Sequence, residues 1–170
     1  MSLRHLNFQP VKPKRDRHSI GGVLAVVAVQ GMIVAHHATS EDVLELANGK
    51  AGYFLMRDVV DAAAFKAALE QQELYPDRGQ FHMPYRQSGV VQADDHDEVW
   101  VEGAALLDAS MDAATTIGCP VTSAAGKFAE VTAAATQEVL GTVVKNVAAL
   151  NGGGGRRFLI KIHRDGRGTP

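Results

Sequence analysis

The chain is nearly devoid of cysteine and has no long apolar run. Cys119 is the only cysteine among 170 residues, so no intrachain disulfide can form and a cytoplasmic origin is expected. The longest apolar run, Val23–Val29, is far shorter than the ~20 residues that a membrane-spanning helix needs. The N-terminus lacks the apolar core of a signal peptide. The shortage of cysteine argues against a disulfide scaffold, and the lack of a long apolar run argues against a membrane partner.

Charge is unevenly distributed, although the net charge is only −2. Residues 1–18 contain five Lys/Arg and one acidic residue, as do residues 156–170, whereas residues 19–155 contain seven basic and 17 acidic residues. Basic ends on an acidic body suit a protein that docks against neighbours or copies of itself, or they are solvated tails that aid solubility. We expect an extended, basic N-terminal arm over residues 1–18 and a single β-rich domain over residues 19–170.

Short runs of β-branched and aromatic residues predict strands in the first half. The apolar stretch within Ser19–Val34 predicts two short strands or one bulged strand. Asn48-Gly49 predicts a tight turn that joins Val43–Leu46 to Tyr53–Met56 as a hairpin. The residues Ser40-Glu41-Asp42-Val43 resemble a helix N-terminus or a turn.

The second half has the pattern of a small all-β module. A turn is predicted at Ala124–Lys127, and Gly152–Gly155 is followed by a strand rather than a helix. That order favours a flexible hairpin linker over a phosphate-binding loop, which needs a helix N-terminus. The predicted strands are Ser88–Gln92, Glu98–Gly103, Cys119–Thr122, Phe128–Val131, Val139–Val144 and Phe158–His163.

Only Asp61–Leu74 has convincing helical periodicity, with Asp61 as N-cap and Phe65 and Leu69 on one face. Ala104–Thr116 is compatible with a helix or with an ordered loop. Turn signals recur every ~8–12 residues, the spacing expected of a sandwich or barrel. The predicted fold class is mainly β: a small β-barrel or sandwich domain with one short helix and an extended N-terminal arm.

Asp94-Asp95-His96-Asp97-Glu98 is the densest group of possible metal ligands. It lacks the glycine-punctuated spacing of a calcium loop and lies where a hairpin turn is expected, so an exposed acidic turn is favoured over a metal site. His36-His37 is interpreted as a polar pair at a strand end, because adjacent strand residues point to opposite faces and cannot easily hold one ion. No metal or other cofactor is predicted.

Cys119 would be a nucleophile only if the fold supplied a base, for which His82, His96 and His163 are the candidates. No flanking motif supports any of them, and Gly118-Cys119-Pro120 is more typical of a small buried residue at a strand start. Direct binding of nucleic acid is not expected either, because the body is acidic and no strand alternates cations with aromatic residues. The chain is therefore predicted not to be an enzyme.

The glycine and valine pattern of the second half resembles the head-decoration (capsid cement) proteins of tailed bacteriophages. The residues that carry the resemblance are Val99–Gly103, Gly118–Thr122, Gly126–Phe128, Val139–Val143 and Phe158–Ile162, and Gly31–Asp58 has a comparable opening.

The resemblance implies a β-tulip or β-barrel module on the outside of an expanded capsid, made in the cytoplasm of a bacterial host. Its partners would be the lattice of the major capsid protein and copies of itself, as a homotrimer. The capsid contact is expected in the arm, which would become ordered on docking and add a strand to a capsid edge. The arm residues concerned are Arg4, Lys12, Lys14, Arg15 and Arg17. Alternatives are another virion subunit (tail tube or head–tail joining), a metal-dependent enzyme built on residues 94–97, and a free-standing nucleic-acid-binding module.

Overall fold

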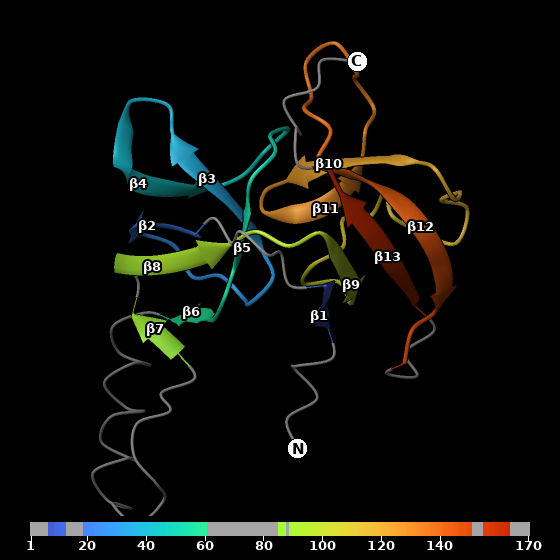
Figure 1. Ribbon diagram of the computed structural model, residues 1–170, viewed down its shortest axis with the longest axis horizontal. Coiled ribbons are helices and arrows are strands. Elements are labelled where there is room, and N and C mark those ends of the chain that lie inside the picture. The colour runs from blue at the N-terminus through green and yellow to red at the C-terminus, as the bar shows by residue number, and fades with distance from the viewer. Residues whose placement is uncertain (1–6, 13–18, 61–84, 88, 151–154, 164–170) are drawn as a thin grey trace, which may run out of the picture.

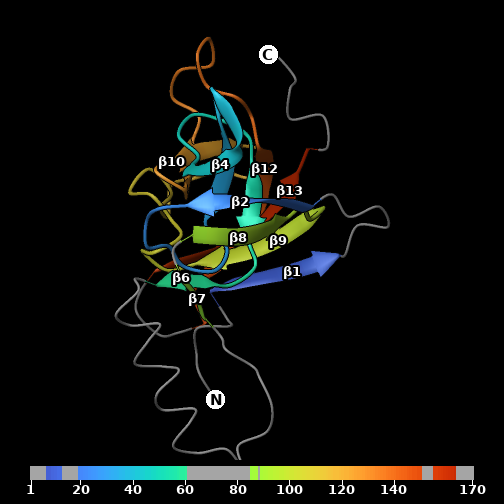
Figure 2. The ribbon, with the colours of Figure 1, turned by 90° about the vertical axis from the view of Figure 1, so that its left-hand side faces the viewer.

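The chain folds into a β-barrel and a six-stranded sheet that share one joint. The computed structural model describes residues 7–12, 19–60, 85–87, 89–150 and 155–163, and all regular elements in these ranges are strands (Figure 1 and Figure 2). The mainly β prediction is therefore confirmed. The predicted helix, Asp61–Leu74, lies outside the described residues.

The six-stranded sheet is antiparallel and runs in the order β1-β9-β13-β12-β10-β11. The closed barrel has the order β2-β4-β3-β5-β8, and β6 and β7 form a short parallel pair. The sheet strands are β1 (Phe8–Lys12), β9 (Glu98–Glu102), β10 (Pro120–Ala124), β11 (Lys127–Glu130), β12 (Gly141–Ala148) and β13 (Arg156–Ile162). The others are β2 (Ser19–Leu24), β3 (Ile33–His37), β4 (Ser40–Leu46), β5 (Tyr53–Leu55), β6 (Asp58–Val60), β7 (Tyr85–Gln87) and β8 (Gly89–Asp94).

The predicted hairpin across Asn48-Gly49 is wrong in its pairing. β4 and β5 both pair with β3, which lies between them. The residues expected to supply a helix start or turn, Ser40–Val43, belong to β4. The Asn-Gly pair does form a bend, with Gly49 at φ +65°, but the chain around it bonds to the six-stranded sheet instead of closing a hairpin.

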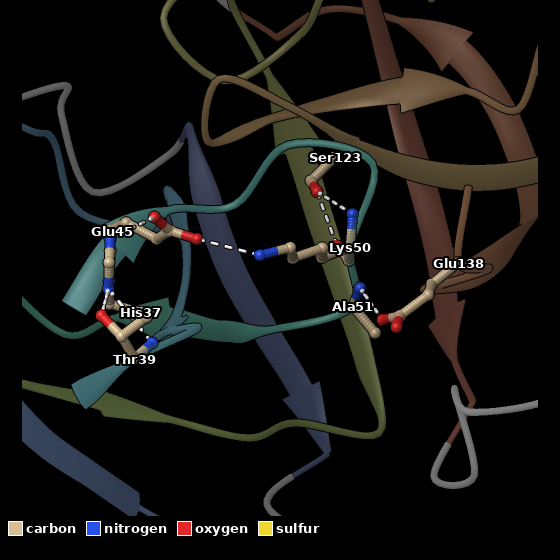
Figure 3. Close-up of polar contacts among 7 residues, drawn as sticks. All are labelled: His37, Thr39, Glu45, Lys50, Ala51, Ser123 and Glu138. Atoms are coloured by element: carbon tan, nitrogen blue, oxygen red, sulfur yellow. Dashed lines mark hydrogen bonds and ion pairs between the residues drawn. The ribbon is translucent and has the colours of Figure 1, made fainter. Parts of the chain in front are cut away.

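The segment between β4 and β5 joins the barrel to the sheet (Figure 3). Gly49 N–H donates to the Ser123 carbonyl at 2.7 Å, and the Ser123 hydroxyl donates to the Lys50 carbonyl at 2.6 Å. Ala51 N–H donates to the Glu138 carboxylate at 2.8 Å. On the sheet side, Gly126 N–H donates to the Ala47 carbonyl, and the Gly126 carbonyl accepts from Ile33 N–H, both at 2.8 Å. Two chain segments about 75 residues apart are thereby held as one unit.

An aromatic cluster fills the core beneath this joint. Phe54 of β5 stacks on Phe128 of β11 with ring centres 5.8 Å apart, and Phe8 of β1 lies 5.5 Å from Phe54. All three rings are at most 4% exposed. The cluster therefore combines one barrel strand with both end strands of the sheet, and the two parts share one core.

The ambiguous segment Ala104–Thr116 is a loop of turns rather than a helix. Asp108 accepts from Ser110 N–H at 3.0 Å and Asp112 accepts from Ala114 N–H at 2.7 Å. Such bonds from an aspartate to the amide two residues ahead compete with helix formation. Hydrogen bonds from the Ser110 backbone and from its side chain lower the pKa of the Asp108 carboxyl.

Replacing Phe8 by alanine tests whether β1 is part of the core. Phe8→Ala should lower the free energy of unfolding by about 3–5 kcal/mol, because it leaves a cavity in the aromatic cluster. Val11→Ala, in the same strand at a side chain that is 42% exposed, should change it by about 0.5 kcal/mol or less. Urea unfolding followed by tryptophan fluorescence measures both. Equal effects of the two changes would place residues 8–12 outside the folded domain.

Candidate functional site

Part of the predicted N-terminal arm belongs to the domain. Residues Phe8–Lys12 form β1, which pairs with β9, and residues 13–18 connect β1 of the sheet to β2 of the barrel. Lys12 lies opposite Glu98 in the strand register. The other predicted arm contacts, Arg4, Lys14, Arg15 and Arg17, lie outside the described residues.

The open edge of β1 is poorly suited to pairing with another strand. Glu102 N–H donates to the Asn7 carbonyl, so alternate residues from Asn7 direct their backbone groups to β9. Phe8 and Pro10 therefore direct theirs to the open edge. Pro10 has no N–H, and proline at such a position is a common way of blunting an edge strand.

The opposite end of the sheet is covered. Phe128 of β11 donates its N–H to the Leu106 carbonyl at 2.7 Å, and its own carbonyl accepts from Asp108 N–H at 2.9 Å. The Ser110 hydroxyl accepts from Glu130 N–H at 3.0 Å. The barrel is closed and offers no edge. Partners of the barrel and of the six-stranded sheet must therefore be recognised mainly through side-chain faces.

The prediction of an exposed acidic turn at residues 94–98 is wrong. Asp94 is 8% exposed and His96 only 3% exposed. The His96 ring packs against both Phe8 and Phe54, with its centre 6.0 Å from the centre of each ring. This turn links β8 of the barrel to β9 of the sheet, so it runs through the shared core and not around the outside. Among the residues that the structure describes, no group of three or more His, Cys, Asp or Glu side chains could hold a metal ion.

Cys119 is half-buried just before β10, and its thiol lies 3.6 Å from the Pro120 carbonyl. Burial raises the pKa of the Cys119 thiol, and the nearby Glu130 carboxylate raises it further. Both effects favour the neutral thiol, which is a poor nucleophile. Of the three candidate bases, His82 lies outside the described residues, His96 lies in the aromatic core and His163 follows β13 with an exposed side chain.

The reactivity of this thiol can be measured directly. Because its pKa is raised, the rate of alkylation by iodoacetamide should increase with pH through a midpoint above that of free glutathione in the same assay. At pH 7.5 the protein should react more slowly than glutathione. Glu130→Gln removes the acidic neighbour and should move the midpoint downward. A midpoint at or below that of glutathione would contradict the assignment of an inert thiol.

The remaining candidate residues, the His36-His37 pair and the glycine run, lie at the end of a strand and in the connection of a hairpin. His36 and His37 are both exposed at the end of β3, as predicted for a polar pair, and His37 Nδ1 lies 3.0 Å from the Thr39 hydroxyl (Figure 3). β12 and β13 form a hairpin whose last paired residues are Ala148 and Arg156. The glycine run lies in the connection between them, and its first three glycines fall outside the described residues.

Sequence reasoning missed a network on the face of the six-stranded sheet opposite the core, here called the outer face. The Arg157 guanidinium lies 4.6 Å from the centre of the Trp100 ring and donates to the Gln9 side chain at 2.9 Å. Its Nε is 3.8 Å from the Glu102 carboxylate, which accepts from Leu150 N–H at 3.0 Å. The network ties three strands to the loop after β12. The alternation in Glu98–Gly103 places Trp100 and Glu102 on one face of a strand. Their partner on β13, Arg157, can be identified only from the pairing register of the two strands.

No helix within the described ranges is long and apolar enough to cross a membrane.

Comparisons with known proteins find no match by sequence, but they find a likeness in fold. No protein-family model matches the chain, and no curated protein matches it. Among solved structures, it is similar to the head fiber gp8.5 N base of bacteriophage phi29, with a TM-score of 0.50 and 12% sequence identity. The likeness covers 88% of this chain and 96% of that chain. At 12% sequence identity the likeness shows a shared fold, which extends over nearly the whole length of both chains.

Proposed function

We propose that the chain is a structural protein of a bacteriophage head and acts as a decoration protein on the outside of the mature capsid. The observation that carries the proposal is the fold shared with a phage head fiber base over almost the full length of both chains. The sequence resemblance to capsid cement proteins supports the same setting. A role of this kind depends on binding and requires no chemical step by the protein.

Decoration proteins stabilise a capsid because they bind the assembled lattice and not the free subunits. Many weak, identical contacts are sufficient, since a molecule that binds the lattice at several points has a higher apparent affinity than any one contact provides. The shared aromatic core and the joint through Ser123 give the chain a rigid body for such contacts. The basic segments at both ends of the sequence are suited to an acidic partner surface.

The capsid contact is assigned to the basic residues of the N-terminal segment, Arg4, Lys12, Lys14, Arg15 and Arg17. Deleting residues 1–18 cannot test this, because the deletion also removes β1 and the buried Phe8 ring. Charge neutralisation separates the two effects. Arg15 and Arg17 precede β2 and lie outside both β1 and the barrel strands.

Arg15→Gln/Arg17→Gln should weaken binding to expanded capsids of the source phage by about tenfold and reduce its dependence on salt. Co-sedimentation at increasing protein concentration measures the affinity and the ratio to the capsid subunit. Arg164→Gln/Arg167→Gln removes the same charge from the other basic end and is the matched control. Equal affinities of the two variants would refute the assignment to the arm, and an absence of saturable binding by the unmodified protein would refute the head-binding role.

The likeness to a fiber base favours a second candidate, a base that attaches an appendage to the head without strengthening it. The two roles differ in their effect on the capsid. A cement protein should raise the temperature at which saturated capsids release DNA, because it stabilises the intact lattice. An attachment base should bind at a fixed ratio and leave that temperature unchanged. Heating capsids with and without bound protein, followed by a DNA-binding dye, distinguishes the roles.

A further inference from the structure

The Asn48-Gly49 pair has a chemical property that its place in the fold does not use. Asparagine followed by glycine is especially prone to deamidation, because glycine has no Cβ to shield its backbone nitrogen from the asparagine side chain. The sequence contains a second such pair, Asn151-Gly152, which lies outside the described residues. The Asn48 side chain is exposed, so the water and hydroxide that the reaction needs can reach it.

Deamidation is a rearrangement between the Asn48 side chain and the backbone nitrogen of Gly49. The nitrogen loses its proton to hydroxide and attacks Cγ of the asparagine. The new C–N bond closes a succinimide ring, and the side-chain nitrogen leaves as ammonia after it takes a proton from water. Water then opens the ring at either of its carbonyl carbons. The product is aspartate in the original backbone, or isoaspartate, in which the side-chain methylene has become part of the backbone.

The joint between the barrel and the sheet holds the nucleophile of this reaction. Gly49 N–H donates to the Ser123 carbonyl at 2.7 Å, so the proton that must be lost is bonded to an acceptor that cannot remove it. The Gly49 carbonyl accepts from Glu138 N–H at 2.9 Å. Both backbone groups of Gly49 are therefore fixed by residues far along the chain, and the nitrogen is released only when these bonds open.

The rest of the reacting unit is held by the β10–β11 turn. The peptide group before Asn48 accepts, through the Ala47 carbonyl, from Gly126 N–H at 2.8 Å. The Asn48 side-chain oxygen accepts from Ala125 N–H at 3.4 Å. Ring closure brings the Gly49 nitrogen to covalent distance from Cγ, which moves the peptide group after Asn48 away from its acceptor. The folded joint therefore opposes the near-attack geometry that the reaction requires.

We propose that Asn48 is a site of spontaneous covalent modification, which the joint keeps unreactive and which reacts when the joint opens. The modification makes a reversible opening irreversible, because isoaspartate adds a methylene between the Ala47 carbonyl and Gly49 N–H. The bonds from these two groups to the β10–β11 turn then no longer fit their original spacing. The proposal concerns the joint alone and does not depend on binding to a phage head.

The test compares the two Asn-Gly pairs in the full-length protein, folded in a mildly alkaline buffer and unfolded in guanidinium chloride at the same pH. Mass spectrometry of proteolytic peptides gives the rate at which each asparagine is converted. In the unfolded chain the two pairs should react at similar rates, since the dipeptide is the same. In the folded protein Asn48 should react about tenfold more slowly or less than when unfolded, because conversion has to wait for the joint to open. Equal rates of Asn48 in the two conditions, or an unreactive Asn48 in the unfolded chain, would overturn the proposal.

Variants of the joint separate its effect from that of the fold as a whole (Figure 3). Ser123→Ala removes the hydroxyl that accepts from Lys50 N–H at 3.1 Å and donates to the Lys50 carbonyl at 2.6 Å. It should speed the conversion of Asn48 in the folded protein by about threefold or more and leave the unfolded rate unchanged. Glu138→Ala removes the exposed carboxylate that accepts from Ala51 N–H at 2.8 Å, and the same result is expected.

Ser110→Ala is the matched control. It removes a hydroxyl that accepts from Glu130 N–H at 3.0 Å, at the other end of β11 from the joint, and should leave the rate at Asn48 unchanged. Circular dichroism and thermal unfolding establish which variants are folded. If the folded joint variants convert Asn48 no faster than Ser110→Ala does, the joint does not control the reaction and the proposal fails.

Discussion

The joint between the barrel and the six-stranded sheet is the constraint on which the rest of the structure depends. The chain from Ala47 to Ala51 leaves one sheet and bonds to the β10–β11 turn and to Glu138, about 75 to 90 residues further along. Gly126, at φ +80°, lies against Leu46, and a side chain at this position would require the Leu46 side chain to move. Because these bonds and the Phe54–Phe128 stack act together, neither part can rotate relative to the other without opening the core.

The mainly β class and most strand positions in the second half were predictable because period-two alternation and turn residues are local signals. Strand pairing was not predictable for the same reason. Asn48-Gly49 is a strong local signal for a hairpin, yet β3 takes both neighbouring strands as partners. The backbone groups at the bend are satisfied by Ser123, which is distant in sequence. A local turn preference is worth less than these bonds together with the pairing of β3 with a strand on each of its edges.

The surface features were harder to predict than the strands. Four carboxylates around a histidine suggest solvent exposure, but His96 lies among phenylalanines because its turn connects the two parts through the core. A proline-containing basic segment suggests a free arm, but Phe8 supplies a core side chain and Pro10 lies where its missing N–H is tolerated. The Arg157 network could not be found from sequence, since its residues come from three strands whose register is set only in the fold.

Because the edges of the barrel and of the six-stranded sheet are closed, covered or blunted, a partner of either sheet would have to be recognised through side chains. Sheet edges bind other strands with little regard to sequence, so an exposed edge promotes aggregation. Here the barrel has no edge, β11 is covered by residues 106–110 and β1 is blunted by Pro10. What these two sheets offer instead are side-chain faces, such as the outer face, where the Arg157 guanidinium lies over the Trp100 ring and beside the buried Glu102 carboxylate. Face-to-face contacts depend on matching shape and charge, so a partner recognised in this way would be selected by its surface and not by a shared strand register.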